Sequence, residues 1–485
     1  MERQTKPTQW TLITSLVILA TAGQVVWGQY AGGSGTADDP YLIATAEQLN
    51  AIGLHPEDGA KHFRLTADID MNDLGEAPVN LIPEFQGVFD GNDHTIANLT
   101  YLVKDEDSPP EWHVVVDIGL FRVISGWDAL VTNLRLTNPD VRPDPTCARS
   151  VDRVGALAGL LDQGWVRNCY VEGGHVRGDD YVGGLVGECW NNAAVSECWS
   201  TTEVSGDLVV GGLVGEAPGA EIWLCHVQAR VSGNGNVGGL VGFSLPKTTI
   251  EDCFTTGDVT GNQAGGLVGF LEQGRVSNCY STASLSGAVT LGGLVGVNHG
   301  LIHASWAGGK IAGGTQVGGL VGYNVVGDGV FAPYFDAKVT DSYATGAVRG
   351  DNMVGGLIAV NEGTLLRCYS TGAVTTSGVV PASNARHTIG GLVATDRGLA
   401  EWDIRDCFWD TTASGVNISR GGTGKTTVEM QAIETYLDAG WDFAGETANG
   451  AEDLWKMRSD EPGYPKLAWE EEAPTDDPPD PNAPN

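Results

Sequence analysis

The sequence predicts an all-β fold: a parallel β-helix, or solenoid, of about 27-residue coils with a short helical cap at each end. Three observations predict it. A glycine-rich motif recurs at a nearly constant spacing, small and polar side chains alternate within each repeat, and helix-capping residues flank the repeat region. A unit this short cannot bury its inner face alone, so neighbouring units must stack on one another.

The recurring motif is Gly-Gly-Leu-Val-Gly, with clear copies at Gly183–Gly187 and Gly238–Gly242. Its first glycine stands at positions 155, 183, 211, 238, 265, 292, 318, 355 and 390. Two longer steps indicate insertions near residues 325–337 and 377–387. The blade of a β-propeller needs roughly 40–50 residues. The shorter period therefore favours stacked coils.

A second segment recurs with the same period, and Cys253–Val259 is an example. Its odd-numbered residues are small or apolar, whereas its even-numbered residues are aromatic, polar or charged. This alternation is typical of a strand with one face in the core and the other toward solvent. We therefore expect the cysteine of each repeat to point inward and the residue after it to point outward.

The outward residue after the cysteine or serine is aromatic in eight repeats and histidine in one. The set is Tyr170, Trp199, His226, Phe254, Tyr280, Trp306, Tyr343, Tyr369 and Phe408. Rings in a row on one face suit stacking on sugars or anchoring of a protein partner, so this stripe is the candidate ligand-binding site. The alternative is that the rings stack on one another, or lie beneath loops, and only stabilise the sheet.

Seven of the nine cysteines share the inward position, which Ser305 and Ser342 fill in two other repeats. We expect these seven to form an internal column of buried free thiols, because parallel neighbours rarely reach disulfide geometry. Cys147 and Cys189 lie off that column and are the better candidates for a disulfide.

The motif followed by segments such as Asn278-Cys279-Tyr280-Ser281-Thr282 resembles the GLUG-motif repeat family, which is found in exported, adhesin-like bacterial proteins. The resemblance covers residues 115–410 well. It extends to Phe89–Asn92 upstream and to Gly421–Thr427 downstream. It implies an exported β-helical region, and it implies no catalytic residue.

The chain divides into five predicted parts. Residues 1–28 are typical of a signal peptide, with Arg3 and Lys6 before a short apolar run. Residues 29–125 form an N-terminal cap with the first coils, and residues 126–410 form the repeat solenoid. Residues 411–469 form a C-terminal cap with a short helix and an aromatic plug. Residues 470–485 form an acidic, proline-rich tail that we expect to be disordered.

The two caps have sequence signals of their own. Thr45 and Gln48 indicate a helix running to about Ile52, and Thr426 with Glu429 indicates a second helix ending near Gly440. Trp441, Phe443, Trp455, Tyr464 and Trp469 follow as the plug.

The formal net charge of −34 disfavours binding to nucleic acid or to anionic lipid. We expect a protein that is secreted or held at the cell surface, with no membrane insertion after signal cleavage and with a glycan or a surface protein as partner. The oligomeric state stays open.

No catalytic residue, metal site or cofactor is expected. The acidic run Asp68–Asp73 lacks the glycine and the final glutamate of a calcium loop. The sequence thus favours a non-enzymatic, exported scaffold or adhesin-like binder. A β-helical polysaccharide lyase or glycoside hydrolase is the alternative, because coiling could bring distant carboxylates together on one face.

Overall fold

A computed structural model describes residues 29–107, 114–326, 337–376, 388–398, 404–457 and 463–471. The expected signal peptide, most of the two insertions and nearly all of the acidic tail lie outside these residues.

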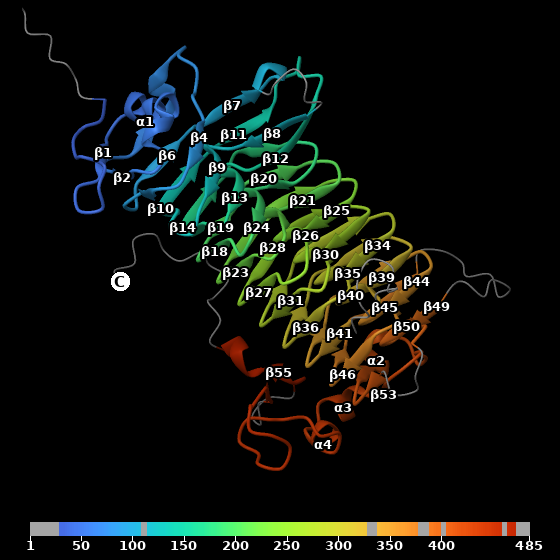
Figure 1. The fold of residues 1–485 in the computed structure, drawn as a ribbon. Coiled ribbons are helices and arrows are strands. Elements are labelled where there is room, and N and C mark those ends of the chain that lie inside the picture. The colour runs from blue at the N-terminus through green and yellow to red at the C-terminus, as the bar shows by residue number, and fades with distance from the viewer. Residues whose placement is uncertain are drawn as a thin grey trace, which may run out of the picture.

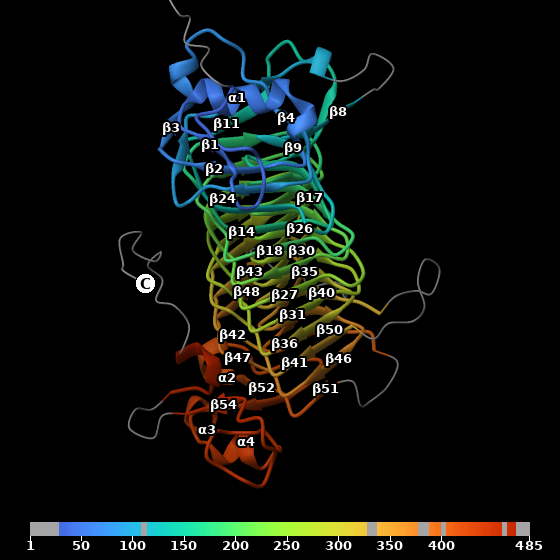
Figure 2. The same ribbon diagram turned by 60° about the vertical axis from the view of Figure 1, so that its left-hand side comes forward.

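The described chain is a parallel β-solenoid, as expected. Each coil passes through a 10-stranded sheet, then an 11-stranded sheet, and then a 32-stranded sheet, before it enters the next coil. All the pairings between coils are parallel and in register, and the coils stack from one end of the molecule to the other (Figures 1 and 2).

The 10-stranded sheet contains β8 (Val114–Ile118), β12 (Ser150–Val154), β16 (Val182–Gly183), β21 (Val209–Gly211), β25 (Asn236–Gly238), β29 (Gln263–Gly265), β34 (Thr290–Gly292), β39 (Gln316–Gly318), β44 (Met353–Gly355) and β49 (Thr388–Gly390). The 11-stranded sheet contains β4 (Ile82–Phe85), β9 (Phe121–Ser125), β13 (Ala158–Asp162), β17 (Val186–Trp190), β22 (Val214–Ala217), β26 (Val241–Ser244), β30 (Val268–Leu271), β35 (Val295–Asn298), β40 (Val321–Asn324), β45 (Ile358–Asn361) and β50 (Val393–Asp396).

The 32-stranded sheet has three columns within the repeat region. The first column holds β10 (Leu130–Thr137), β14 (Trp165–Glu172), β18 (Ala194–Ser196), β23 (Glu221–Trp223), β27 (Thr249–Glu251), β31 (Arg275–Ser277), β36 (Leu301–His303), β41 (Lys338–Thr340), β46 (Thr364–Leu366) and β51 (Ile404–Arg405). The second holds the end of β14, then β19 (Trp199–Ser200), β24 (His226–Ser232), β28 (Phe254–Thr260), β32 (Tyr280–Ser281), β37 (Trp306–Ala307), β42 (Tyr343–Ala344), β47 (Tyr369–Ser370) and β52 (Phe408–Asp410).

The third column holds β11 (Asp140–Pro143), β15 (His175–Arg177), β20 (Glu203–Ser205), β33 (Ser284–Gly287), β38 (Ile311–Gly313), β43 (Val348–Gly350) and β48 (Val374–Thr376). The long strands β24 and β28 continue into it. The remaining strands of this sheet are β1 (Tyr41–Ile43), β2 (His62–Leu65), β3 (Ile69–Asp70), β5 (Val88–Asp90), β6 (Thr95–Ala97), β7 (Thr100–Val103) and β53 (Thr423–Lys425).

The glycines of the motif are required by close backbone contact at the turn between the two smaller sheets. A Cβ on Gly238 would lie 1.8 Å from the Val241 carbonyl oxygen, and one on Gly239 would lie 2.0 Å from that of Gly266. No side chain fits in that space. The leucine and valine of the motif, Leu240 and Val241, are fully buried in the core.

The N-terminal end is closed by α1 (Ala46–Leu54), whose Leu49 and Ile52 are buried. Thr45 caps this helix as expected, accepting a hydrogen bond from the Gln48 amide (3.4 Å). The first coils beneath it are filled by a cluster of aromatic rings that the sequence analysis did not single out: Phe63, Phe85, Phe89 and Phe121.

At the other end, Thr426 and Glu429 form the expected capping box. The single helix predicted to reach Gly440 is instead two short ones, α3 (Thr427–Met430) and α4 (Glu434–Leu437), preceded by α2 (Thr411–Ser414). The hairpin strands β54 (Trp455–Lys456) and β55 (Lys466–Leu467) follow. The short 3₁₀ segments are Pro56–Asp58, Met71–Leu74, Asp105–Asp107 and Ala468–Glu471.

Candidate functional site

The predicted stripe is a continuous ladder of stacked rings on the outer surface of the second strand column. Seven consecutive contacts join Tyr170 to Tyr369, with ring centroids 4.7–5.8 Å apart. From His226 to Tyr369 the interplanar angles are 1–6°. Phe408 pairs with Tyr369 in the strand register and extends the column by one coil. We call this set, Tyr170 to Phe408, the aromatic ladder.

A sharp corner in each coil sets the direction of these rings. The residue before the inward cysteine or serine has a left-handed backbone, with φ between 46° and 55°. The corner residues are Asn168, Glu197, Leu224, Asp252, Asn278, Ala304, Asp341, Arg367 and Asp406. The next side chain then enters the core, and the one after it faces outward.

The ladder is much less exposed than expected. Each ring is covered above and below by its neighbours, and Trp199 and Tyr280 keep only 8% and 7% of their surface. Tyr170, His226, Phe254 and Trp306 are half-buried. The alternative of self-stacking therefore describes this surface: ring edges, and not ring faces, are turned to solvent.

The ladder from Tyr280 to Phe408 is covered by the chain itself. Tyr343, Tyr369 and Phe408 form a separate apolar cluster with Met430, Tyr436, Trp441, Phe443, Trp455 and Leu467. The Trp469 indole donates a hydrogen bond to the Ala304 carbonyl (3.0 Å), and the Tyr343 hydroxyl donates one to Glu470 (2.9 Å). The aromatic plug predicted for the end of the solenoid lies instead along its side.

His226 is the histidine of the ladder and lies in its uncovered part. It stacks on Phe254 with a centroid distance of 4.7 Å and on Trp199 at 5.8 Å. Burial between these rings lowers the pKa of His226 to about 4, because the charged imidazolium loses its hydration there. The ladder is therefore neutral at pH 7.

The inward cysteines form the expected column of buried free thiols. Each column member bonds to the next coil, as where the Cys225 amide donates to the Cys253 sulfur (3.4 Å). Ser305 and Ser342 accept the same bond at 3.1 Å. Because a hydroxyl and a thiol serve the same role, serine can replace cysteine in this column.

The expectation for Cys147 and Cys189 was wrong, because both are free thiols. Cys189 is fully buried and pairs in register with the core residue Leu161, so it belongs to a second inward column. Cys147 lies at the surface, where its thiol donates to Asp105 (3.3 Å).

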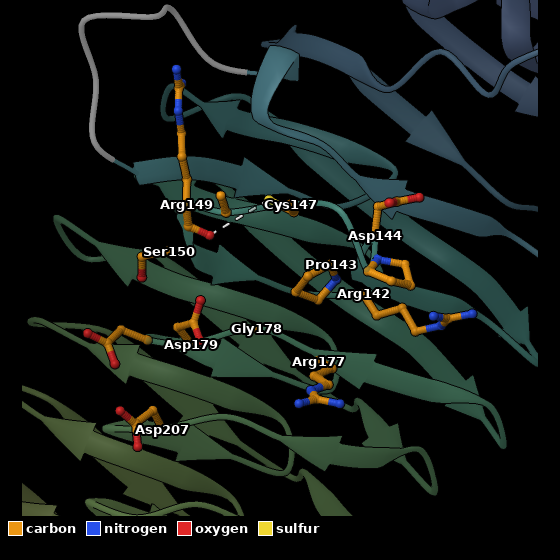
Figure 3. A pocket seen from close by; sticks show the side chains of 13 residues that line it. Arg142, Pro143, Asp144, Cys147, Arg149, Ser150, Arg177, Gly178, Asp179 and Asp207 are labelled. Carbon is orange, nitrogen blue, oxygen red and sulfur yellow. Dashed lines mark hydrogen bonds between the residues drawn. The ribbon is translucent and has the colours of Figure 1, made fainter.

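Coiling brings together carboxylates that the sequence analysis did not identify. An open cleft of about 650 Å³ lies near the third strand column. Figure 3 shows Asp179 and Asp207 on one side of it and Arg142 and Arg177 on the other. Asp179 accepts the Val151 amide (2.8 Å), and Asp207 accepts the Asn234 side-chain amide (2.7 Å). Both carboxylates therefore fix neighbouring backbone, Asp179 at strand β12 and Asp207 at the turn that contains Asn234.

A second acidic group is nearly buried. Glu188 and Glu216 are neighbours in the register of β17 and β22. Burial and the adjacent Glu188 raise the pKa of Glu216 to about 8. Arg153 lies beside Glu188 (3.7 Å) and pairs with Asp117 (2.9 Å). Glu188 is only 4% exposed, which leaves no room for a substrate.

The described residues contain neither a cluster of metal ligands nor a membrane-spanning helix. No group of three or more histidine, cysteine or acidic side chains there is placed to hold a metal ion. No helix in the same residues has the length and apolar character needed to cross a membrane.

Comparison with known proteins connects the repeat to a family. A family model of the GLUG motif matches residues 233–260, 261–286 and 313–349. The chain is 34% identical over 178 residues to halomucin of Haloquadratum walsbyi, a match covering 34% of this chain and 2% of halomucin. It is 33% identical over 162 residues to a putative Gly-rich membrane protein of Evansella cellulosilytica, covering 32% of this chain and 17% of that protein. The chain thus spans a small part of these relatives.

Among solved structures, a putative immunoglobulin A1 protease from Bacteroides ovatus aligns with 91% of this chain and 96% of its own, at 18% identity and a TM-score of 0.37. A second structure, an IgA1 protease, aligns with 87% of this chain and 26% of its own, at 15% identity and a TM-score of 0.31. The family matches, together with the stacked parallel coils, establish that this chain is a β-solenoid carrying GLUG-motif repeats.

Proposed function

We propose that this chain is an exported, non-enzymatic scaffold or adhesin-like protein that binds a protein or glycan partner along the uncovered part of its aromatic ladder. The observation that carries the proposal is that the C-terminal segment of the chain itself packs on the covered part of the ladder. There, rings projecting from a flat β-surface hold a peptide segment through Trp441, Trp455 and Trp469.

The same surface continues over Tyr170, Trp199, His226 and Phe254 without a partner ring cluster in the described residues. The ring faces are occupied by neighbouring rings, so a partner would meet ring edges and the polar side chains beside them. Interfaces commonly combine rigid aromatic groups with a polar rim. Rigid stacking also means that little side-chain entropy is lost when a partner binds.

The test is a glycan-array and surface-protein screen of residues 29–485, repeated with Trp199→Ala and Trp306→Ala variants. Trp306 packs against the chain's own C-terminal cluster, whereas Trp199 does not. Both substitutions leave a gap in the stack, and circular dichroism would report folding. Trp199→Ala should weaken binding about tenfold or more while Trp306→Ala does not. Equal binding by both variants would contradict the proposal.

A β-helical carbohydrate-active enzyme is the second candidate, favoured by the cleft that contains Asp179, Asp180 and Asp207. Burial raises the pKa of Asp180, a shift that acid catalysts in glycosidases also need. The hydrogen bonds of Asp179 to strand β12 and of Asp207 to the Asn234 side chain favour a structural role instead.

Mass spectrometry of glycans incubated with the chain separates the two candidates. We expect no cleavage product. Cleavage that disappears in both Asp179→Asn and Asp207→Asn variants, with folding retained, would establish the enzyme and overturn the binding proposal.

A further inference from the structure

Four tryptophans gather on an edge of the solenoid distinct from the aromatic ladder. Trp127, Trp165 and Trp190 are 60%, 40% and 44% exposed, and Trp223 is half-buried. They lie on four consecutive coils. Trp165 and Trp223 are on strands β14 and β23 of the first column, Trp190 ends strand β17, and Trp127 lies in the turn before β10. We call this set the tryptophan edge. The strands that carry it follow one another along one side of the molecule in Figure 1.

The strand register places these residues together. Trp165 pairs with Ala194, and Ser196 pairs with Trp223 on the following coil. The two indoles meet over this intervening coil edge-to-face, with centroids 6.0 Å apart and planes at 88°. Ala194 and Ser196 are only 2% and 1% exposed, because the large rings on either side shelter these small side chains. The result is a fixed aromatic platform.

Trp127 and Trp190 lie at turns that precede the first strand column, on coils to either side of the coil that carries Trp165. Ala129 donates its amide to Gly126, and Ala193 donates its amide to Trp190, so the two turns close in the same way (both 3.0 Å). The turns are two coils apart, a separation of about 10 Å at the usual spacing between strands. That spacing is close to the repeat of alternate sugar rings in an extended polysaccharide chain.

Neither apolar cluster of the described residues includes these four side chains, so the core does not account for them. Large exposed apolar side chains gathered on neighbouring coils are typical of an interaction site. The surrounding groups define the partner. Asp162 accepts a hydrogen bond from the Asn191 side chain (2.8 Å), and Asp128 and Glu221 are exposed nearby. Arg167, on the same strand as Trp165, is paired with Glu197 (2.9 Å).

The chemistry combines flat indole rings with carboxylate and amide groups that bind hydroxyls, and its charge is negative. Indole rings pack against the apolar C–H face of a sugar, while carboxylates and amides bond its hydroxyl groups. An anionic glycan would be repelled. We propose that the tryptophan edge binds a neutral, extended polysaccharide across Trp127, Trp165 and Trp190.

The test is affinity electrophoresis of residues 29–485 in gels containing xyloglucan, glucomannan or mixed-linkage β-glucan, with polygalacturonate as the anionic comparison. We expect retardation by at least one neutral polysaccharide and none by polygalacturonate. A Trp127→Ala/Trp190→Ala variant should lose about tenfold or more in affinity with an unchanged melting temperature, since both side chains are exposed.

Leu208→Ala and Val428→Ala remove exposed apolar groups outside the tryptophan edge and serve as matched controls. Trp199→Ala tests the aromatic ladder separately. The proposal for the tryptophan edge and the proposal for the ladder can therefore be rejected independently of each other. The proposal is overturned if no neutral polysaccharide retards the chain, if the double variant binds as well as the parent, or if only a basic protein binds this edge.

Discussion

Single residues at the coil corners show how far the fold tolerates strain. The left-handed corner suits asparagine and aspartate, which occupy five of the nine corners, but Leu224 occupies one with φ of 54°. A left-handed backbone costs roughly 1–2 kcal/mol for an ordinary side chain. Leu224 is 52% exposed, so little core packing compensates for this cost.

Leu224→Asn should therefore raise the free energy of unfolding by about 1 kcal/mol. Chemical denaturation followed by circular dichroism would measure it. The reverse change, Asn278→Leu, places leucine at an equivalent corner with φ of 52° and should lower the free energy of unfolding by a similar amount. Destabilisation by Leu224→Asn would show that leucine gains more from contacts than the corner costs.

His226 should make stability depend on pH. Its pKa in the folded chain is about 4, below its ordinary value of 6.5, so the folded state favours the neutral ring. The contribution to stability is complete above pH 6.5 and is lost as the pH falls toward 4, by on the order of 2–3 kcal/mol. In His226→Phe, the ring cannot be protonated.

Melting temperatures of the parent and of His226→Phe, measured from pH 7 to pH 4, should diverge in favour of the variant as acid is added. Phe254→Tyr, which leaves the histidine in place, should follow the parent. Parallel curves for parent and His226→Phe would show that His226 takes up its proton equally well in the folded and unfolded states.

Within each repeat, the motif glycines are needed because the backbone packs closely at the turn, and they do not form a ligand site. Gly238→Ala would set a methyl group against the Val241 carbonyl, 1.8 Å away, with backbone on both sides. We expect a loss of about 3 kcal/mol or more, measured by chemical denaturation. Gly32→Ala is the control: its nearest contact would be the Leu42 side chain at 3.6 Å, and stability should change little.

The cysteine column gives the next prediction for the repeat. In the folded chain a thiol reagent should label Cys147 alone, since the other eight cysteines are buried. All nine should react in denaturant without a reducing agent. Fewer than nine labels under those conditions would reveal disulfides and contradict the free-thiol column.

The elements that sequence could predict are those governed by local periodicity. The alternation through Cys253–Val259 correctly assigned the inward cysteine and the outward ring, and Thr45 and Thr426 correctly marked helix starts. Exposure of the ladder was not predictable in this way. It depends on residues 430–457 and 463–470, which cover Tyr343 and Tyr369 in a contact that has no periodic signal.

The candidate sites were less predictable for the same reason. Glu188 and Glu216 stand 28 residues apart and meet only because the register of β17 and β22 aligns them. Trp165 and Trp223 meet across a coil that happens to carry alanine and serine. Tryptophans occur at irregular places within the repeat, so no fixed spacing pointed to the edge they form.

The whole molecule is one repetitive solenoid, and a segment of its own chain covers the outer rings toward the C-terminal end. The solenoid core and the C-terminal cluster are separate apolar clusters, joined through the outer rings and not through the interior. Because each coil contacts mainly its neighbours, a repeat array can lose a terminal segment while distant coils stay folded. The covering segment contacts the coils from Tyr280 to Phe408, so we expect the coils before Tyr280 to fold without it.

Truncation after Thr426 tests this arrangement. It would expose Tyr343, Tyr369 and Phe408, now 4%, 1% and 6% exposed, as one hydrophobic surface. We expect increased binding of a hydrophobic dye and concentration-dependent association by ultracentrifugation, with most β-sheet circular dichroism retained. Adding Tyr343→Glu and Tyr369→Glu to the truncated chain should restore the monomer, since charge on that surface opposes association. Complete unfolding of the truncated chain would instead show that the C-terminal segment holds the entire solenoid, because the coils would then not be stable independently of one another.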